Sequence, residues 1–122
     1  MFAKLEDVEK RYEELNKKIS DPEVISKQSE WQKYMKEHSS IIDIVEKYRE
    51  YKKAKDDLEQ AREMLNDKEL KELAEIEMEE LREKLPKIEE ELNEREYKRD
   101  YKKYIVELHF RKFLDKVHEV YE

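Results

Sequence analysis

The sequence predicts an all-α protein: an antiparallel bundle or coiled-coil hairpin of long helices with an additional C-terminal helix. Three observations lead to this prediction. Half of the 122 residues are charged, there is no glycine, and apolar residues recur at three- and four-residue steps. Such steps place side chains on one face of a helix. Because glycine is the usual residue for sharp turns, phosphate-binding loops and close backbone–ligand approaches, we expect a scaffold or docking module and not an enzyme.

The first apolar stripe predicts a helix that ends at Ser20. Its members are Phe2, Leu5, Val8, Tyr12, Leu15 and Ile19. Asp21 followed by Pro22 is typical of the cap and first position of a new helix. A short helical turn through Ile25 is therefore expected, and Ser26 offers a cap for the helix after it.

A longer stripe predicts a helix from about Gln28 to Leu65, roughly 55 Å long at about 1.5 Å per residue. Polar residues fill one heptad position near residues 52–55. The apolar face consists of Trp31, Tyr34, His38, Ile41, Val45, Tyr48, Tyr51, Leu58, Ala61 and Leu65. We expect Asn66 to adopt a left-handed cap and Asp67 to cap the following helix.

The third stripe predicts a helix that continues through Pro86. Its apolar members are Leu70, Leu73, Ala74, Met78, Leu81, Leu85, Ile88 and Leu92. Proline removes one backbone hydrogen bond and clashes with the preceding turn. Because the stepping stays in phase on both sides, a kink is favoured over a stop. Tyrosine and leucine seams should hold the helices together, and an uncovered seam would need a partner helix or a second copy.

Beyond Asn93 the pattern changes. Residues 94–103 are charged apart from tyrosines. Residues 104–108 contain the β-branched pair Ile105 and Val106 and are open between strand and helix. Helical spacing returns at Phe110, Phe113, Leu114, Val117, Val120 and Tyr121. We therefore divide the chain into residues 1–92 and a C-terminal helical extension, residues 93–122, whose placement the sequence leaves open.

Composition narrows the possible functions. Acidic residues outnumber basic ones by 34 to 27, and the net charge of −7 argues against non-specific coating of nucleic acid. The absence of cysteine excludes disulfides and thiolate metal sites, and the three histidines are too dispersed for a metal site. No apolar run is long enough to span a bilayer. We expect a cytoplasmic protein with no cofactor, metal, membrane contact or small-molecule substrate.

One cluster is net basic and is the candidate contact for a partner or RNA. It comprises Arg95, Lys98, Arg99, Lys102 and Lys103, interleaved with tyrosines that include Tyr101. On a helix, residues 95, 98, 99 and 102 share a face that could meet RNA phosphates while a tyrosine stacks on a base. The alternative is a solvated face whose tyrosines pack inward, because Glu96 and Asp100 dilute the cluster and salt screens it.

Residues 1–16, MFAKLEDVEKRYEELN, and the block SDPEVIS at residues 20–26 closely resemble the start of bacterial peptide chain release factor 1, a class I release factor. The runs IVEKYREYKK at 44–53 and MLND at 64–67 resemble the same family. The resemblance covers about residues 1–92. It implies the N-terminal helical domain, a separate lobe that leans toward the stalk base of the ribosome.

The resemblance also implies that the family's chemistry lies elsewhere. Peptidyl-tRNA hydrolysis in the family needs a Gly-Gly-Gln motif, which a chain without glycine lacks. After residue 93 the family continues with a strand, a glycine-rich segment and a helix of the core domain. Residues 104–108 and 110–121 could stand for that strand and helix, or form an unrelated helix that extends the lobe. The chain is then a fragment or a truncated relative.

Two functions are compatible with these observations. The first is a non-catalytic release-factor domain that serves translation termination by docking to the ribosome or a termination partner. The alternative is a structural coiled-coil module that self-associates as a homo-oligomer through its tyrosine and leucine seams.

Overall fold

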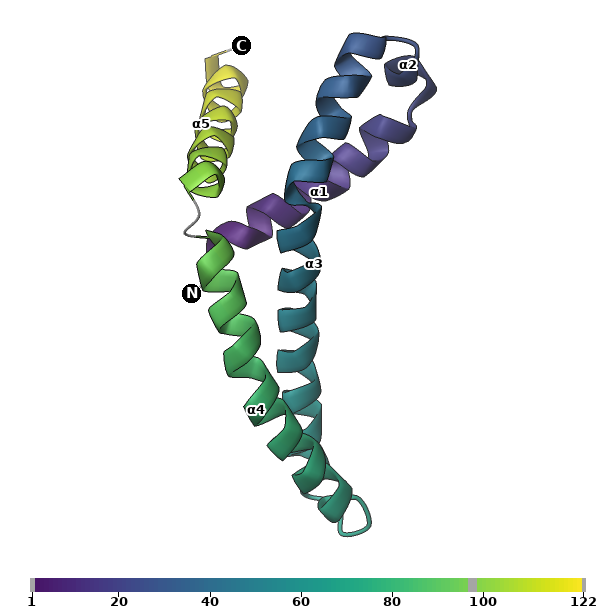
Figure 1. Ribbon diagram of the computed structural model, residues 1–122, viewed down its shortest axis with the longest axis vertical. Coiled ribbons are helices and arrows are strands. Elements are labelled where there is room, and N and C mark those ends of the chain that lie inside the picture. Colours follow the sequence, from purple (N-terminus) through teal and green to yellow (C-terminus); the bar gives the residue numbers. More distant parts are fainter. Residues whose placement is uncertain (1, 97–98, 122) are drawn as a thin grey trace. The chain divides into compact units, whose positions relative to one another are not determined.

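The computed structural model describes residues 2–96 and 99–121, and the side chains of residues 96, 99–102 and 121 lie outside this description. Its elements are α1 (Ala3–Ser20), α2 (Pro22–Ile25), α3 (Gln28–Met64), α4 (Lys71–Glu96) and α5 (Arg99–Tyr121) (Figure 1). Every regular element of the described part is a helix, which confirms the predicted all-α class.

The chain divides into two compact units. One contains Met1–Val45 together with Arg95–Glu122, and the other contains Glu46–Glu94. The first unit therefore holds α1, α2, the N-terminal half of α3 and α5. The second holds the hairpin made by the C-terminal half of α3 and most of α4.

Three helices supply the buried apolar side chains of the first unit. These are Phe2, Leu5, Val8 and Leu15 at α1, Ile41, Ile44 and Val45 on α3, and Ile105 and Leu108 on α5. The α1 members belong to the predicted stripe. Trp31 on α3 adds a polar contact, because its indole Nε1–H donates to the carbonyl of Ile19, 3.1 Å away. Tyr12 and His38 stack with ring centroids 4.7 Å apart.

The α1–α3 connection follows the predicted capping at Asp21. Its Oδ1 accepts a hydrogen bond of 3.0 Å from the backbone N–H of Glu23, and Pro22 occupies the first turn of α2. The expectation for Ser26 was wrong. Its hydroxyl donates to the carbonyl of Glu23 at 2.7 Å and so completes the end of α2 instead of capping α3.

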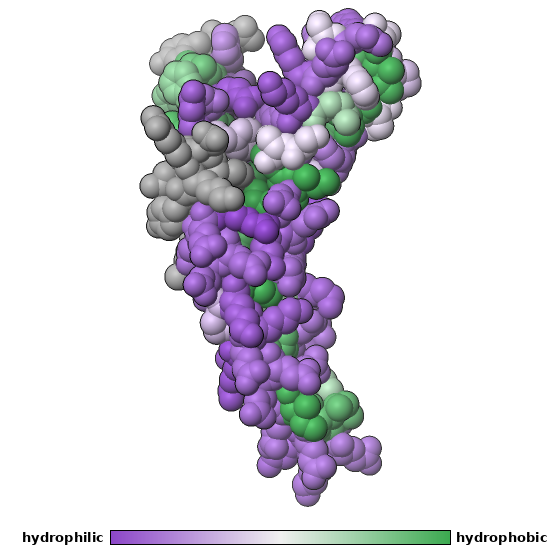
Figure 2. Space-filling model, viewed as in Figure 1, coloured by the Kyte–Doolittle hydropathy of each residue, from purple (hydrophilic) through white to green (hydrophobic). Residues whose placement is uncertain are grey.

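The second unit buries aromatic residues and alanines along the seam between its two helices. The buried side chains are Tyr48, Tyr51, Ala54, Ala61, Ala74, Met78, Leu81, Ile88 and Leu92. Figure 2 shows a narrow line of hydrophobic side chains there, bordered by hydrophilic ones. Ala54 is buried in this seam, although the apolar stripe predicted from the sequence did not include it. Lys52 and Lys55 lie over the rings of Tyr48 and Tyr51, at 4.9 and 5.4 Å.

The beginning of the third apolar stripe also differs from the prediction. Leu73 is 58% exposed, and Leu70 precedes α4 and is exposed as well. Ala74 is fully buried. Leu73 lies one position, about 100° around the helix, from Ala74 and so faces away from the seam.

The turn between α3 and α4 closes without a left-handed residue. No described non-glycine residue has a positive φ, so the predicted left-handed cap at Asn66 was wrong. The chain instead tightens: the N–H groups of Leu65, Asn66 and Asp67 each donate to the carbonyl three residues earlier. Asp67 accepts from the N–H of Glu69 at 3.0 Å, which caps the turn that leads into α4.

Two further expectations concern α4 and α5. Pro86 lies inside α4, and the helix continues through it, as predicted. Residues 104–108, which the sequence left open, are helical and belong to α5. None of the described helices combines the length and the apolar character that crossing a membrane requires.

Candidate functional site

A polar site that joins three helices of the first unit is centred on the carboxylate of Glu37. Arg11 of α1 binds it through two hydrogen bonds of 2.9 Å, from Nε to Oε1 and from Nη2 to Oε2. This fork-on-fork geometry fixes both groups in one plane. The ion pair raises the pKa of Arg11, chiefly through the hydrogen bond to Glu37.

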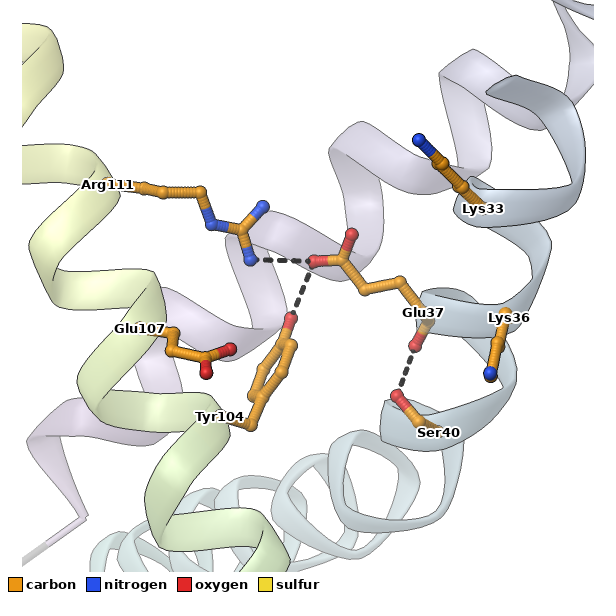
Figure 3. Close-up of a pocket in the computed structure, with 7 residues that line it drawn as sticks. All are labelled: Lys33, Lys36, Glu37, Ser40, Tyr104, Glu107 and Arg111. Carbon is orange, nitrogen blue, oxygen red and sulfur yellow. Dashed lines mark hydrogen bonds and ion pairs between the residues drawn. The ribbon is translucent and has the colours of Figure 1, made fainter. Parts of the chain in front are cut away.

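Helix α5 reaches the same carboxylate. Figure 3 shows Glu37 pointing from α3 toward α5, where Tyr104 and Arg111 converge on it. The Tyr104 hydroxyl donates to Oε1 at 3.1 Å, and Arg111 Nη2 lies 3.4 Å from the same oxygen. One acidic residue of α3 therefore contacts both α1 and α5.

The surroundings change the acidity of both groups. Burial alone would raise the pKa of Glu37, but the hydrogen bonds and charge of Arg11, assisted by Tyr104 and Arg111, lower it below its usual value. Burial raises the pKa of the Tyr104 phenol, and the charge of Glu37 raises it further. At neutral pH the site thus holds an ionised carboxylate and a neutral phenol.

A groove of about 330 Å³ lies beside this carboxylate, between α3 and α5. Its lining comes from residues 33, 36, 37 and 40 of α3 and residues 104, 107 and 111 of α5 (Figure 3). Both sets follow three- and four-residue steps, so each forms one helix face. We call this hollow the α3–α5 groove.

The α3–α5 groove has an excess of positive charge. Three of its lining residues are cations, namely Lys33, Lys36 and Arg111, whereas two are acids. Arg11 already matches the charge of Glu37. Within the described part of the chain, neither lysine has an ion-pair partner. The groove can therefore accept an anionic group.

A second polar contact joins α1 to α5 through Asp7. Its Oδ1 accepts from Lys112 Nζ at 3.0 Å, and Oδ2 lies 3.9 Å from Nε2 of His109. The side chains of this contact are partly exposed, between 30% and 50%. Among the described residues, no group of histidine and acidic side chains is suited to hold a metal ion.

Comparison with known proteins identifies the family of this chain. The model of the PCRF domain matches residues 8–110. This chain belongs to the PCRF domain family. The match includes both Arg11 and Glu37, and it extends into the first half of α5.

Curated relatives of this PCRF domain include three bacterial proteins named peptide chain release factor 1. That of Clostridium acetobutylicum is 57% identical over 95 residues, which is 75% of this chain and 26% of the relative. That of Clostridium botulinum is 53% identical over 95 residues, again 75% of this chain and 26% of the relative. That of Thermoanaerobacter pseudethanolicus is 57% identical over 76 residues, 61% of this chain and 21% of the relative.

These findings confirm the resemblance to release factors. The chain spans about a quarter of the length of these two clostridial relatives. No solved structure matches it significantly. The proposed boundary between residues 1–92 and residues 93–122 stays a prediction.

Only two residues of the predicted basic cluster, Arg95 and Lys103, have side chains within the described part of this PCRF domain. Arg95 lies in the last turn of α4, and its Nη1 donates to the carbonyl of Asp43 at 3.0 Å. Lys103 is exposed on α5, one turn before Glu107. Lys98 lies outside the described residues, as do the side chains of Arg99, Tyr101 and Lys102. Whether these cations share one face therefore stays a prediction.

Sequence reasoning did not single out Lys33, Lys36, Glu37 or Arg111. The partners of Glu37 are 26, 67 and 74 residues away in sequence, so no local spacing reports them. One signal was present. Glu37 directly precedes His38 and borders the apolar stripe of α3, where a charged residue must find a partner if it is covered.

Proposed function

We propose that this chain is a non-catalytic module of translation termination that docks on the ribosome. The observation that carries this proposal is the PCRF-domain match over residues 8–110, together with curated relatives named peptide chain release factor 1. The 122 residues contain no glycine and thus no Gly-Gly-Gln motif. Hydrolysis of peptidyl-tRNA by the chain alone is therefore not expected.

The contact surface in this proposal comprises the α3–α5 groove and the basic cluster. Lys33 and Lys36 keep their charge free for a ligand, and Lys103 is exposed on the same helix as Arg111. Ribosomal RNA presents phosphates at regular intervals, and lysines bind them in a salt-dependent manner. The chain has a net charge of −7, so RNA would be repelled by most of its surface. A local excess of cations would attract RNA to that one part of the surface.

The proposal places the protein in the cytoplasm, where ribosomes terminate translation, and the stalk base of the ribosome is the expected region of contact. In this proposal other cations of the cluster, namely Lys98, Arg99 and Lys102, add to the contact with RNA. Arg95 would contribute less, because its guanidinium is already bonded to Asp43.

Co-sedimentation with ribosomes tests this proposal. The double variant Lys33→Glu, Lys36→Glu should bind more weakly. If both lysines contact phosphates, the slope of log K against log salt should fall by about 2. The matched control is Lys84→Glu, Lys87→Glu, which makes the same charge change at two exposed positions of α4. Equal loss in both double variants would show a general charge effect and would contradict a specific surface.

A second pair of measurements tests the rest of the proposal. The triple variant Lys98→Glu, Arg99→Glu, Lys102→Glu should also weaken ribosome binding if the cluster takes part. The unaltered chain should release no peptide from peptidyl-tRNA. Release by the purified chain would overturn the non-catalytic assignment.

A further inference from the structure

Helix α5 has an exposed apolar face that the first unit does not cover. Ile105 and Leu108 are buried, but Val106, Phe110, Phe113, Leu114 and Val120 are between 41% and 75% exposed. Residues 106, 110, 113, 117 and 120 follow steps of four, three, four and three, and all five are Val or Phe. This is the spacing of the contact positions in a coiled coil. We call it the outer α5 face.

The outer α5 face is large enough for a specific interface. Its exposed fractions correspond to an apolar area on the order of 500 Å² per chain, because a phenylalanine alone can bury about 150–250 Å². Two such faces would together remove about 1,000 Å² from water, which is about the minimum for a specific protein interface.

The outer α5 face is also shaped for a protruding side chain. A hollow of about 440 Å³ is lined by Val106, Glu107, Phe110 and Arg111. Phe113 lies one turn further along the same face and is 62% exposed. The face thus carries both a socket and a ring that could fill such a socket in another molecule.

We propose that the outer α5 face binds the same face of a second copy of the chain, with the two α5 helices antiparallel. Phe113 of each copy would then enter the hollow beside Phe110 of the other. Val106 would lie opposite Val117 of the other copy. The contact is self-complementary, as two-fold symmetry requires. A parallel pair in register would place each residue against itself and leave both hollows empty.

This self-association does not use the lysines of the α3–α5 groove, although Glu107 and Arg111 line both that groove and the hollow of the outer α5 face. It also differs from the seam association expected from the sequence. Tyr48, Tyr51 and Leu81 are buried within a single chain, whereas four of the five residues of the outer α5 face are exposed and Val117 is partly buried.

Sedimentation equilibrium of the full chain tests the proposal. We expect a mass of two chains that falls to one chain on dilution. Phe110→Asp should give one chain at all concentrations while far-ultraviolet circular dichroism shows unchanged helix content. Leu73→Asp is the control, because Leu73 is exposed to a similar extent on α4 and should leave the dimer intact. A monomeric parent chain, or a dimer that survives Phe110→Asp, would overturn the proposal.

Disulfide formation tests the orientation, since the chain contains no cysteine. In an equal mixture of Val106→Cys and Val117→Cys, the antiparallel arrangement predicts a disulfide between the two different chains. Val117→Cys alone should not cross-link, because its two copies would be about 16 Å apart along the axis, well beyond disulfide reach. A disulfide formed by Val117→Cys alone would show a parallel pair and refute the antiparallel arrangement.

Discussion

Arg11 of α1 and Glu37 of α3 share two hydrogen bonds of 2.9 Å, and Glu37 also accepts a hydrogen bond from Tyr104 of α5. The side chains of Arg11 and Glu37 are only 13% and 17% exposed. A pair in this position is coupled to the packing of three helices, whereas an ion pair on an exposed helix face is not. Its removal should therefore affect the whole unit.

The first prediction concerns the stability that this pair supplies. Glu37→Gln keeps the shape of the side chain but leaves Arg11 with a neutral acceptor, and we expect a loss of about 2 kcal/mol in the free energy of unfolding. Arg62→Ala removes the exposed pair between Glu59 and Arg62 and should cost at most about 0.5 kcal/mol. Urea unfolding followed by circular dichroism measures both. Equal losses would show that burial gives the Arg11 pair no special weight.

The second prediction concerns acid. The folded-state pKa of Glu37 lies below its unfolded value of about 4.5. The carboxylate therefore contributes stability in full above that unfolded value and loses it as the pH falls through the folded value. The stability difference between the parent chain and Glu37→Gln should shrink as the pH is lowered from about 6 to about 3. Urea midpoints at several pH values measure this difference. A constant difference would show that Glu37 does not titrate as inferred.

The third prediction concerns the attachment of α5. Tyr104→Phe removes the hydroxyl that bonds to Glu37 while keeping the ring. We expect faster amide hydrogen exchange in residues 103–118 and unchanged exchange in the α3–α4 hairpin. The raised pKa of Tyr104 also gives the parent chain stability that is lost above about pH 10, as the phenol ionises. Tyr104→Phe has no such phenol, so its stability should fall less steeply in that pH range. An equal increase in exchange rate throughout the chain would contradict a local role for the Tyr104 hydroxyl.

The fourth prediction concerns the core of the first unit. Leu15 is fully buried, so Leu15→Ala should lower the free energy of unfolding by about 3 kcal/mol through lost transfer energy and a residual cavity. Leu73→Ala makes the same chemical change at an exposed position and should cost less than about 1 kcal/mol. Thermal and urea unfolding of both variants would check this difference. A small effect at Leu15 would mean that α1 is not packed as described.

Much of the fold could be predicted because it depends on local periodicity. The long helix was expected from Gln28 to Leu65 and spans Gln28–Met64, since apolar residues recur at helical steps along most of its length. Asp21 followed by Pro22 marked α2 for an equally local reason. Ala54 was missed because an alanine between lysines looks polar in a hydropathy pattern, although its small side chain suits a close helix contact.

The candidate site could be predicted only in part, because it depends on contacts far apart in sequence. Glu37 meets Tyr104 and Arg111 only after α5 has packed in the first unit. Nothing in the spacing around Glu37 names those partners. The exposed face of α5 was visible as a pattern from Phe110 onward, but its exposure was not, because a helical stripe has the same spacing whether another helix covers it or not.

The contact between Trp31 and Ile19 gives this protein a built-in optical probe. Trp31 is the only tryptophan of the chain, and its ring is half-buried with its N–H bonded to α1. Separation of α1 from α3 would expose the indole to water, so its fluorescence emission should shift to longer wavelength. Fluorescence therefore reports on one helix pair while circular dichroism reports on the whole chain. A difference between the two transitions would reveal whether the two units unfold one after the other.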